Sequence, residues 1–167
     1  ATLYSPPSLY INNPHYRTQA QHTTTAANAA LAAGFRVAES TIEGAGKGLF
    51  IHNHDIQSGE VIGVYQGMYS THSDTGAHTS THERYNTNRI IKLKQNVASG
   101  DEYILCGSHS CYTTYINHKE DITGDTNATL HQTLSTGVIV IIATKPGTHG
   151  EELFIEYGKV FFGSSNS

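Results

Sequence analysis

The chain has 167 residues, which is enough for one domain with a modest core. Its formal net charge of −4, with 14% charged residues, argues against a nucleic-acid binder, because such proteins normally present a basic face. The longest apolar run, 138–143, is far too short to cross a bilayer, and no signal peptide is recognisable. Two cysteines imply neither a disulfide framework nor a zinc site, so we expect an intracellular protein, nuclear or cytoplasmic, without bound metal.

Residues 1–34 differ in composition from the rest of the chain. Their prolines and polar residues predict an extended arm, and the alanine-rich stretch that follows predicts a short helix over 24–33 that ends at Gly34. From 35 to 167 we expect a single domain in which β-structure dominates.

Short apolar runs separated by Gly, Asn, Asp and Ser clusters predict several strands in this domain. The predicted strands are 35–39, 48–53, 60–67, 89–93, 101–106, 127–134, 136–143 and 152–157. A second short helix is expected over 109–115. Residues 70–88 are polar and without apolar periodicity, which predicts a long, variable loop.

Three separated segments carry the residues that are most informative about function. The first is the turn Gly46-Lys47-Gly48, followed by Tyr65-Gln66-Gly67, and its glycines permit close approach of a ligand to the backbone. The second is Tyr115-Ile116-Asn117-His118, and the third is the charged and apolar run 150–158. Taken singly, the three segments are better explained as a β-turn before a strand, a capped turn and an edge strand with a charged start.

In this order and at these separations, the segments resemble the SET domain of protein lysine methyltransferases over about 36–162. The resemblance implies a β-rich α+β fold, the β-clip, in which several small sheets surround a C-terminal pseudoknot. Two pairs of residues depart from the family pattern: Thr114-Tyr115 replaces Arg-Phe, and Lys119-Glu120 replaces Ser-Cys. Asn127 is the nearest candidate for the family's following asparagine. Without the cysteine-rich flanking zinc clusters, the chain resembles a minimal or divergent member.

The resemblance implies methyl transfer from S-adenosyl-L-methionine to a lysine ε-amine, with S-adenosyl-L-homocysteine as the product. The substrate would be a lysine-containing protein or peptide, a histone tail in chromatin or another protein. Such a transfer needs a neutral amine, a water-poor channel and alignment of the reacting groups, and no metal.

The resemblance also assigns roles to individual residues. Tyr157 would place its hydroxyl near the transferring methyl group, and Tyr103 would hydrogen-bond the incoming lysine. The implied cofactor-binding residues are Gly46, Lys47, Gly48, Tyr65, Asn117, His118 and Phe162. The implied substrate-channel residues are Ile155, Phe161 and Tyr115. Ordinary core packing explains Phe161 and Phe162 equally well. Ile155 has no hydroxyl to hold a water, which favours di- or trimethylation.

Two other functions remain open from the sequence. The chain could be a catalytically weak SET-like module that binds a peptide or a partner, as the altered residues after His118 suggest. It could also share only the small β-clip architecture and bind no cofactor. Residues 70–88 fall where the family varies most and are a candidate for substrate choice.

Overall fold

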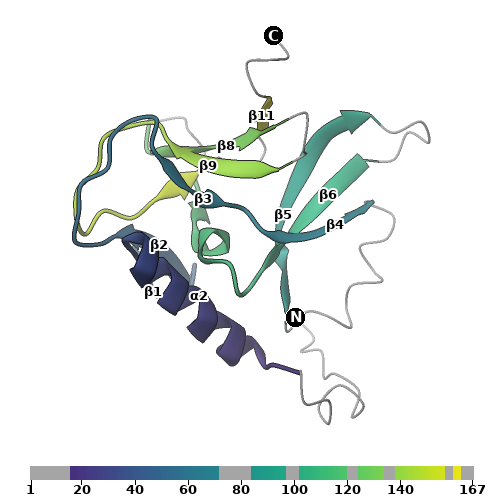
Figure 1. Ribbon diagram of the computed structural model, residues 1–167, viewed down its shortest axis with the longest axis horizontal. Helices are drawn as coiled ribbons and strands as arrows, with labels where there is room; N and C mark the ends of the chain where they lie inside the picture. The colour runs from purple at the N-terminus through teal and green to yellow at the C-terminus, as the bar shows by residue number, and fades with distance from the viewer. Residues whose placement is uncertain are drawn as a thin grey trace.

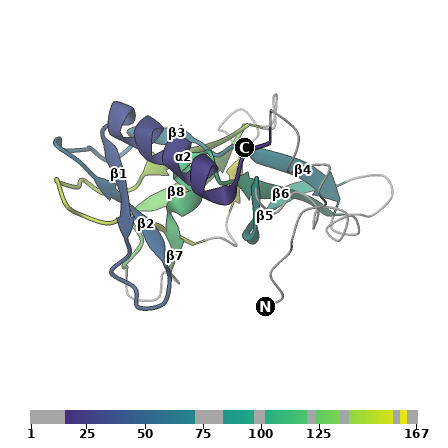
Figure 2. The ribbon, with the colours of Figure 1, turned by 90° about the horizontal axis from the view of Figure 1, so that it is seen from below.

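The computed structural model describes residues 16–71, 84–96, 102–119, 124–133, 138–156 and 160–162. Within these ranges the chain forms a single α-helix, a short 3-10 helix and four small sheets (Figure 1). Seen from below, β1, β2 and β7 lie on one side of the molecule, and the sheet of β4, β5 and β6 lies on the other (Figure 2). This arrangement confirms the β-rich fold of several small sheets that the sequence predicts.

The helix α2 (Gln19–Ala33) begins five residues earlier than predicted. Thr18 caps it, since its hydroxyl accepts from the Gln21 backbone N–H while the Gln21 side chain accepts from the Thr18 N–H. The threonines at 23–25 fit inside the helix because each hydroxyl donates to the carbonyl oxygen four residues earlier. The helix ends at Gly34, as predicted, with a left-handed φ of 90°.

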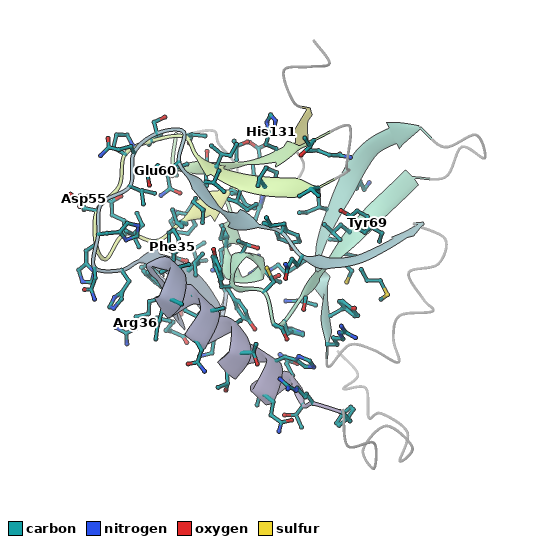
Figure 3. All side chains as sticks on the ribbon, in the orientation of Figure 1. Phe35, Arg36, Asp55, Glu60, Tyr69 and His131 are labelled. Carbon is teal, nitrogen blue, oxygen red and sulfur yellow. The ribbon has the colours of Figure 1, made fainter. Side chains whose placement is uncertain are left out.

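The helix packs against the hairpin of β1 (Phe35–Glu39) and β2 (Lys47–Ile51), which pair antiparallel. Phe35 is 3% exposed and points into the core, while Arg36 points outward, as expected for neighbouring residues of a strand (Figure 3). Ala26 and Ala30 form the buried side of the helix. The hairpin carries the Gly-Lys-Gly turn at its second strand.

The core lies against a four-stranded sheet in the order β11 (Val160–Phe162), β8 (Ala128–Gln132), β9 (Ile139–Ala143) and β3 (Val61–Val64). Alternate residues of β8 and β9 are buried, which is the pattern of a sheet with one face in the core. β11 pairs parallel with β8 and forms one edge of this sheet.

A three-stranded antiparallel sheet holds β4 (Gly67–Thr71), β6 (Glu102–Ser108) and β5 (Tyr85–Asn96). The predicted loop 70–88 is therefore wrong at both ends, since its first two residues belong to β4 and its last four to β5. These parts of β4 and β5 were not predicted because their residues are mostly polar, and they are stabilised by pairing with β6. Residues 72–83 lie outside the described part of the chain.

The 3-10 helix η2 (Tyr112–Tyr115) replaces the predicted helix over 109–115 and leads into β7 (Asn117–His118). β7 pairs parallel with β10 (Phe154–Ile155), which comes from the C-terminal part of the chain. This pairing brings the third sequence segment against the second, which is the contact expected of the C-terminal pseudoknot.

Gln132, the last residue of β8, is fully buried, and neither its amide oxygen nor its amide nitrogen has a hydrogen-bond partner among the described residues. A buried, unsatisfied amide costs about 1–3 kcal/mol. We therefore expect Gln132→Met, which keeps the shape and removes the polar atoms, to raise the free energy of unfolding by about 1 kcal/mol. Urea denaturation measures this change, and a lowered midpoint with an unchanged slope would contradict it.

Candidate active site

Asn117 lies at the meeting point of the three sequence segments and is 2% exposed. Its side-chain nitrogen donates to the Lys47 carbonyl at 3.1 Å and to Glu152 Oε2 at 3.2 Å. Both partners are acceptors only, which fixes the orientation of the amide. The opposite atom, Asn117 Oδ1, accepts a hydrogen bond from the guanidinium of Arg89.

Glu152 is the buried anion of the site. Its carboxylate accepts from Ser40 Oγ at 2.7 Å, and from the Thr41 N–H and hydroxyl at 2.8 and 2.6 Å. Burial alone would raise its pKa, but the donors of Thr41, Ser40 and Asn117 outweigh this effect and hold the pKa below its usual value. The carboxylate is therefore ionised at neutral pH and fixes the 40–41 turn to Asn117.

Because the folded state lowers the pKa of Glu152, its stabilising contribution is present above the unfolded-state pKa and is lost as pH falls through the folded value. We expect Glu152→Gln to lower the free energy of unfolding by about 2 kcal/mol at pH 7 and to flatten its decline at acid pH. Thermal melts from pH 7 to 3 measure both effects. Glu151→Gln, at an exposed position next in the chain, is the matched control; equal pH profiles for the two variants would contradict the assignment.

The segment that holds Glu152 is fixed on both sides by backbone pairing. On one side the Leu153 N–H donates to the Leu49 carbonyl at 2.8 Å, next to the Gly-Lys-Gly turn. On the other side β10 pairs with β7, and the Lys119 N–H donates to the Ile155 carbonyl at 3.0 Å. The described part of the segment 150–158 thus lies between the Gly-Lys-Gly turn and the Asn-His strand.

Asn127 secures the same segment from a third direction. Its side chain donates to the Glu152 carbonyl at 2.9 Å and accepts from the Phe154 N–H at 2.8 Å, on either side of Leu153. Asn127 comes later in the chain than the family pattern places its asparagine. Its side chain nevertheless holds residues 152–154 through these two hydrogen bonds. The altered residue Lys119 also has a defined contact, since its Nζ lies 4.3 Å from the centre of the Phe154 ring.

An open pocket of about 400 Å³ lies beside Asn117. Its described lining residues are Ile42, Ala45, Asn86, Arg89, Asn117 and His118. It combines short apolar side chains, a buried amide and one permanent cation, whereas His118 is exposed at its rim. This composition suits a ligand that has an apolar part and a charged, amino-acid-like end.

The two glycines of the Gly-Lys-Gly turn are needed for different reasons. Gly46 adopts a left-handed backbone, with φ of 74°. Gly48 does not, but a Cβ there would stand 2.3 Å from Glu152 Oε2 and 3.2 Å from Asn117 Nδ2. Lys47 contributes its carbonyl to the site, while its side chain lines a separate groove beside α2.

Three of the residues assigned to the site contact other parts of the protein. Tyr65 is 2% exposed, and its hydroxyl donates to the Arg89 carbonyl at 3.2 Å. The Tyr115 hydroxyl lies 3.0 Å from Thr23 Oγ1 and 2.8 Å from the His109 carbonyl, and burial raises its pKa. Ile155 is fully buried in the core cluster.

The remaining assigned residues are placed only in part. Tyr157 lies outside the described ranges, two residues beyond the end of β10. The backbone of Tyr103 lies on β6 opposite Thr71, and those of Phe161 and Phe162 lie on β11 opposite His131 and Gln132. Their roles stay predictions.

Arg89, Asn86 and Glu152 belong to the site although the sequence does not assign them to it. Arg89 and Asn86 lie in β5, where the β5–β6 register shifts between Tyr85 and Ile90. Such irregularities redirect side chains near functional sites. No sequence signal identifies Arg89 or Asn86. Glu152 stands in a sequence that is typical of the charged start of an edge strand, so its burial was not predicted.

The site and its sheets define a β-clip protein with a pocket at the Asn-His segment, and comparisons with known proteins agree. The family model described as SET domain matches residues 46–158, more than half of the chain. The chain therefore belongs to the SET domain family.

Solved structures give the same fold. The crystal structure of CpSET8 from Cryptosporidium matches with a TM-score of 0.54 and 16% identity, over 75% of this chain and 58% of that chain. Polycomb repressive complex 2 of Chaetomium thermophilum matches with a TM-score of 0.51 and 24% identity, over 74% of this chain and 16% of that chain. This chain thus spans only part of either neighbour. No curated protein matches it.

Two further findings concern only the residues that the structure describes. Among them, no group of three or more His, Cys, Asp or Glu side chains is placed to hold a metal ion. Within the same ranges, no helix is both long and apolar enough to cross a membrane.

Proposed function

We propose that this chain is a protein-lysine N-methyltransferase that uses S-adenosyl-L-methionine. The observation that carries the proposal is the junction at Asn117, where the Gly-Lys-Gly turn, the Asn-His strand and the Glu152 segment meet beside the pocket. Membership of the SET domain family supports it. The neighbours CpSET8 and polycomb repressive complex 2 suggest a histone or another protein as the substrate.

The pocket residues fit this cofactor. Asn117 Oδ1 is turned away from Glu152 and accepts from Arg89, and its second lone pair can accept from an ammonium group. Gly48 leaves no room for a side chain because Glu152 and Asn117 occupy that space, and this close packing holds the Asn117 amide in place. When bound, the cofactor supplies an electrophilic methyl group on its sulfonium.

The protein's own task is then to position the groups and to exclude water. The paired strands β7 and β10 fix the backbone on which Tyr157 follows, and Asn127 restrains that backbone from the other side. Fixed placement of reacting groups can contribute roughly 7–11 kcal/mol to a rate enhancement. Tyr157 would direct its hydroxyl at the methyl group, and Tyr103 would hold the lysine amine.

A methyl-transfer assay tests the proposal. The chain is incubated with S-adenosyl-L-methionine and mixed histones or lysine peptides, and the products are analysed by mass spectrometry. We expect added methyl groups on lysine. Binding of S-adenosyl-L-homocysteine in calorimetry without transfer to any lysine substrate would instead favour the catalytically weak binding module. The same spectra test whether Ile155 permits di- and trimethylation, since a product stopping at one methyl would reject that prediction.

A further inference from the structure

Helix α2 lies outside the part of the chain that the family model matches, which begins at residue 46. It nevertheless contacts both elements that meet at Asn117. One is the β1–β2 hairpin, against which the helix packs (Figure 1) and whose Lys47 carbonyl accepts from the Asn117 amide. The other is η2, which ends two residues before Asn117. Just before η2, Ser110 Oγ lies 2.5 Å from His22 Nδ1 of the helix.

The main contact between α2 and η2 depends on one hydroxyl group. The Tyr115 hydroxyl lies 3.0 Å from Thr23 Oγ1 of the helix, and it donates to the His109 carbonyl at 2.8 Å. It therefore ties the helix to both ends of the turn 109–115. The family pattern has phenylalanine in place of Tyr115, so this link is a feature of this chain.

A displacement of Tyr115 would be transmitted to Asn117, because the residue between them is held firmly. Ile116 is fully buried in the core, and its N–H donates to the Thr113 carbonyl at 3.2 Å. The Asn117 amide nitrogen donates to its two acceptors at 3.1 and 3.2 Å. These lengths are at the upper end of the usual range of about 2.7–3.2 Å for such bonds. A small shift of the backbone would therefore weaken both.

Thr23 is also directed at the hairpin. It lines the groove beside α2 together with Val37 of β1 and Lys47 of β2. The side chain of Lys47 thus lines this groove while its carbonyl accepts from Asn117. One side chain of the helix therefore lies between the two elements that supply the donor and the acceptor of this hydrogen bond.

We propose that α2 is a positioning element of the cofactor site, with Thr23 and Tyr115 as its positioning residues. Their contact holds η2 in a fixed place relative to the hairpin, so that Asn117 stays aligned with the Lys47 carbonyl. Neither Thr23 nor Tyr115 is among the described residues that line the pocket. This inference rests on the proposed function, because the group being positioned is the amide beside the cofactor pocket.

Four single substitutions and one double substitution test this link. Tyr115→Phe removes only the hydroxyl of the tyrosine, Thr23→Val removes the hydroxyl of the helix, and Thr23→Ser keeps it. Thr24→Val is the matched control, since Thr24 lines the same groove and also donates to the carbonyl four residues earlier, but is exposed. The double variant combines Tyr115→Phe with Thr23→Val.

Two measurements are made on each protein at a temperature at which thermal melts show all of them folded. Calorimetry gives the affinity for S-adenosyl-L-homocysteine, and NMR without ligand follows the side-chain amide signal of Asn117. We expect Tyr115→Phe and Thr23→Val each to lower the affinity about 5-fold, as for one lost hydrogen bond, and to shift the amide signal. The double variant should lose no more than either single one, because both remove the same contact. Thr23→Ser and Thr24→Val should leave both measurements unchanged.

Two outcomes would reject the positioning role. If Tyr115→Phe lowers the melting temperature but changes neither the affinity nor the Asn117 signal, the contact serves stability alone. If the two losses multiply to about 25-fold in the double variant, the residues act separately and their contact is not the link. If the unaltered protein does not bind S-adenosyl-L-homocysteine, the proposed function fails. The Asn117 signal then still decides whether α2 positions this residue.

Discussion

Alanine at position 48 is expected to lower the affinity for S-adenosyl-L-homocysteine by about 100-fold or more, because a shift of about 1 Å in a positioning group can cost on the order of 10²-fold. The new Cβ would lie 2.3 Å from Glu152 Oε2 and 2.9 Å from its carboxyl carbon. Glu152 cannot move without breaking its bonds to Ser40 and Thr41. Its displacement would also remove the anchor that orients Asn117.

The measurement is calorimetry on Gly48→Ala, with thermal melts alongside. We expect the overpacking to cost about 1–3 kcal/mol of stability as well. Gly59→Ala is the matched control, since a Cβ there meets open space and only its left-handed backbone, with φ of 91°, is strained. If Gly48→Ala binds as tightly as the control, the network around Glu152 does not shape the cofactor pocket.

Removal of the Tyr157 hydroxyl is expected to have the largest effect on catalysis. Tyr157→Phe should lower the rate of methyl transfer by about 100- to 1,000-fold, as when one preorganised polar contact to a transition state is lost. Affinity for S-adenosyl-L-homocysteine should change little, because phenylalanine keeps the aromatic ring and loses only the hydroxyl.

Single-turnover transfer with a histone peptide, compared between Tyr157→Phe and the unaltered chain, measures this loss. Tyr69→Phe provides the matched control, since it removes a hydroxyl from a half-exposed tyrosine on β4, away from the pocket lining. Undiminished transfer by Tyr157→Phe would reject the catalytic role of the tyrosine. A comparable loss in Tyr69→Phe would show that the assay reports stability rather than chemistry.

The sequence predicts the apolar strands of this fold well and the polar ones poorly. Strand 35–39 is confirmed with both boundaries, and within it Phe35 is buried while Arg36 and Glu39 are exposed. β5 extends from Tyr85 to Asn96 although only 89–93 is predicted, since its polar residues are held by pairing with β6. The two-residue strands β7 and β10 have no pattern of their own and exist only through contact with each other.

The candidate site shows the same division. The positions of Gly48 and Asn117 follow from the family motifs, and the structure adds the physical reason for each. Glu152 was recognisable as part of a motif, but its four hydrogen bonds come from residues more than a hundred positions away and from Asn117. The place of Arg89 in the pocket could not be predicted from the sequence, because it lies within a register shift of β5.

The altered residues after His118 are compatible with an intact site. Lys119 lies over the Phe154 ring and keeps its backbone bond to Ile155, and Asn127 still clamps the Glu152 segment. These contacts supply local order where the family pattern is lost.

A crystal structure with S-adenosyl-L-homocysteine tests the proposed site most directly. We predict that the ligand occupies the pocket between Ala45, Asn117 and His118, with its ammonium group on Asn117 Oδ1. The sulfur should face the segment that leads to Tyr157. A ligand bound elsewhere, or a pocket that stays empty at saturating ligand, would contradict both the cofactor and the function proposed for this chain.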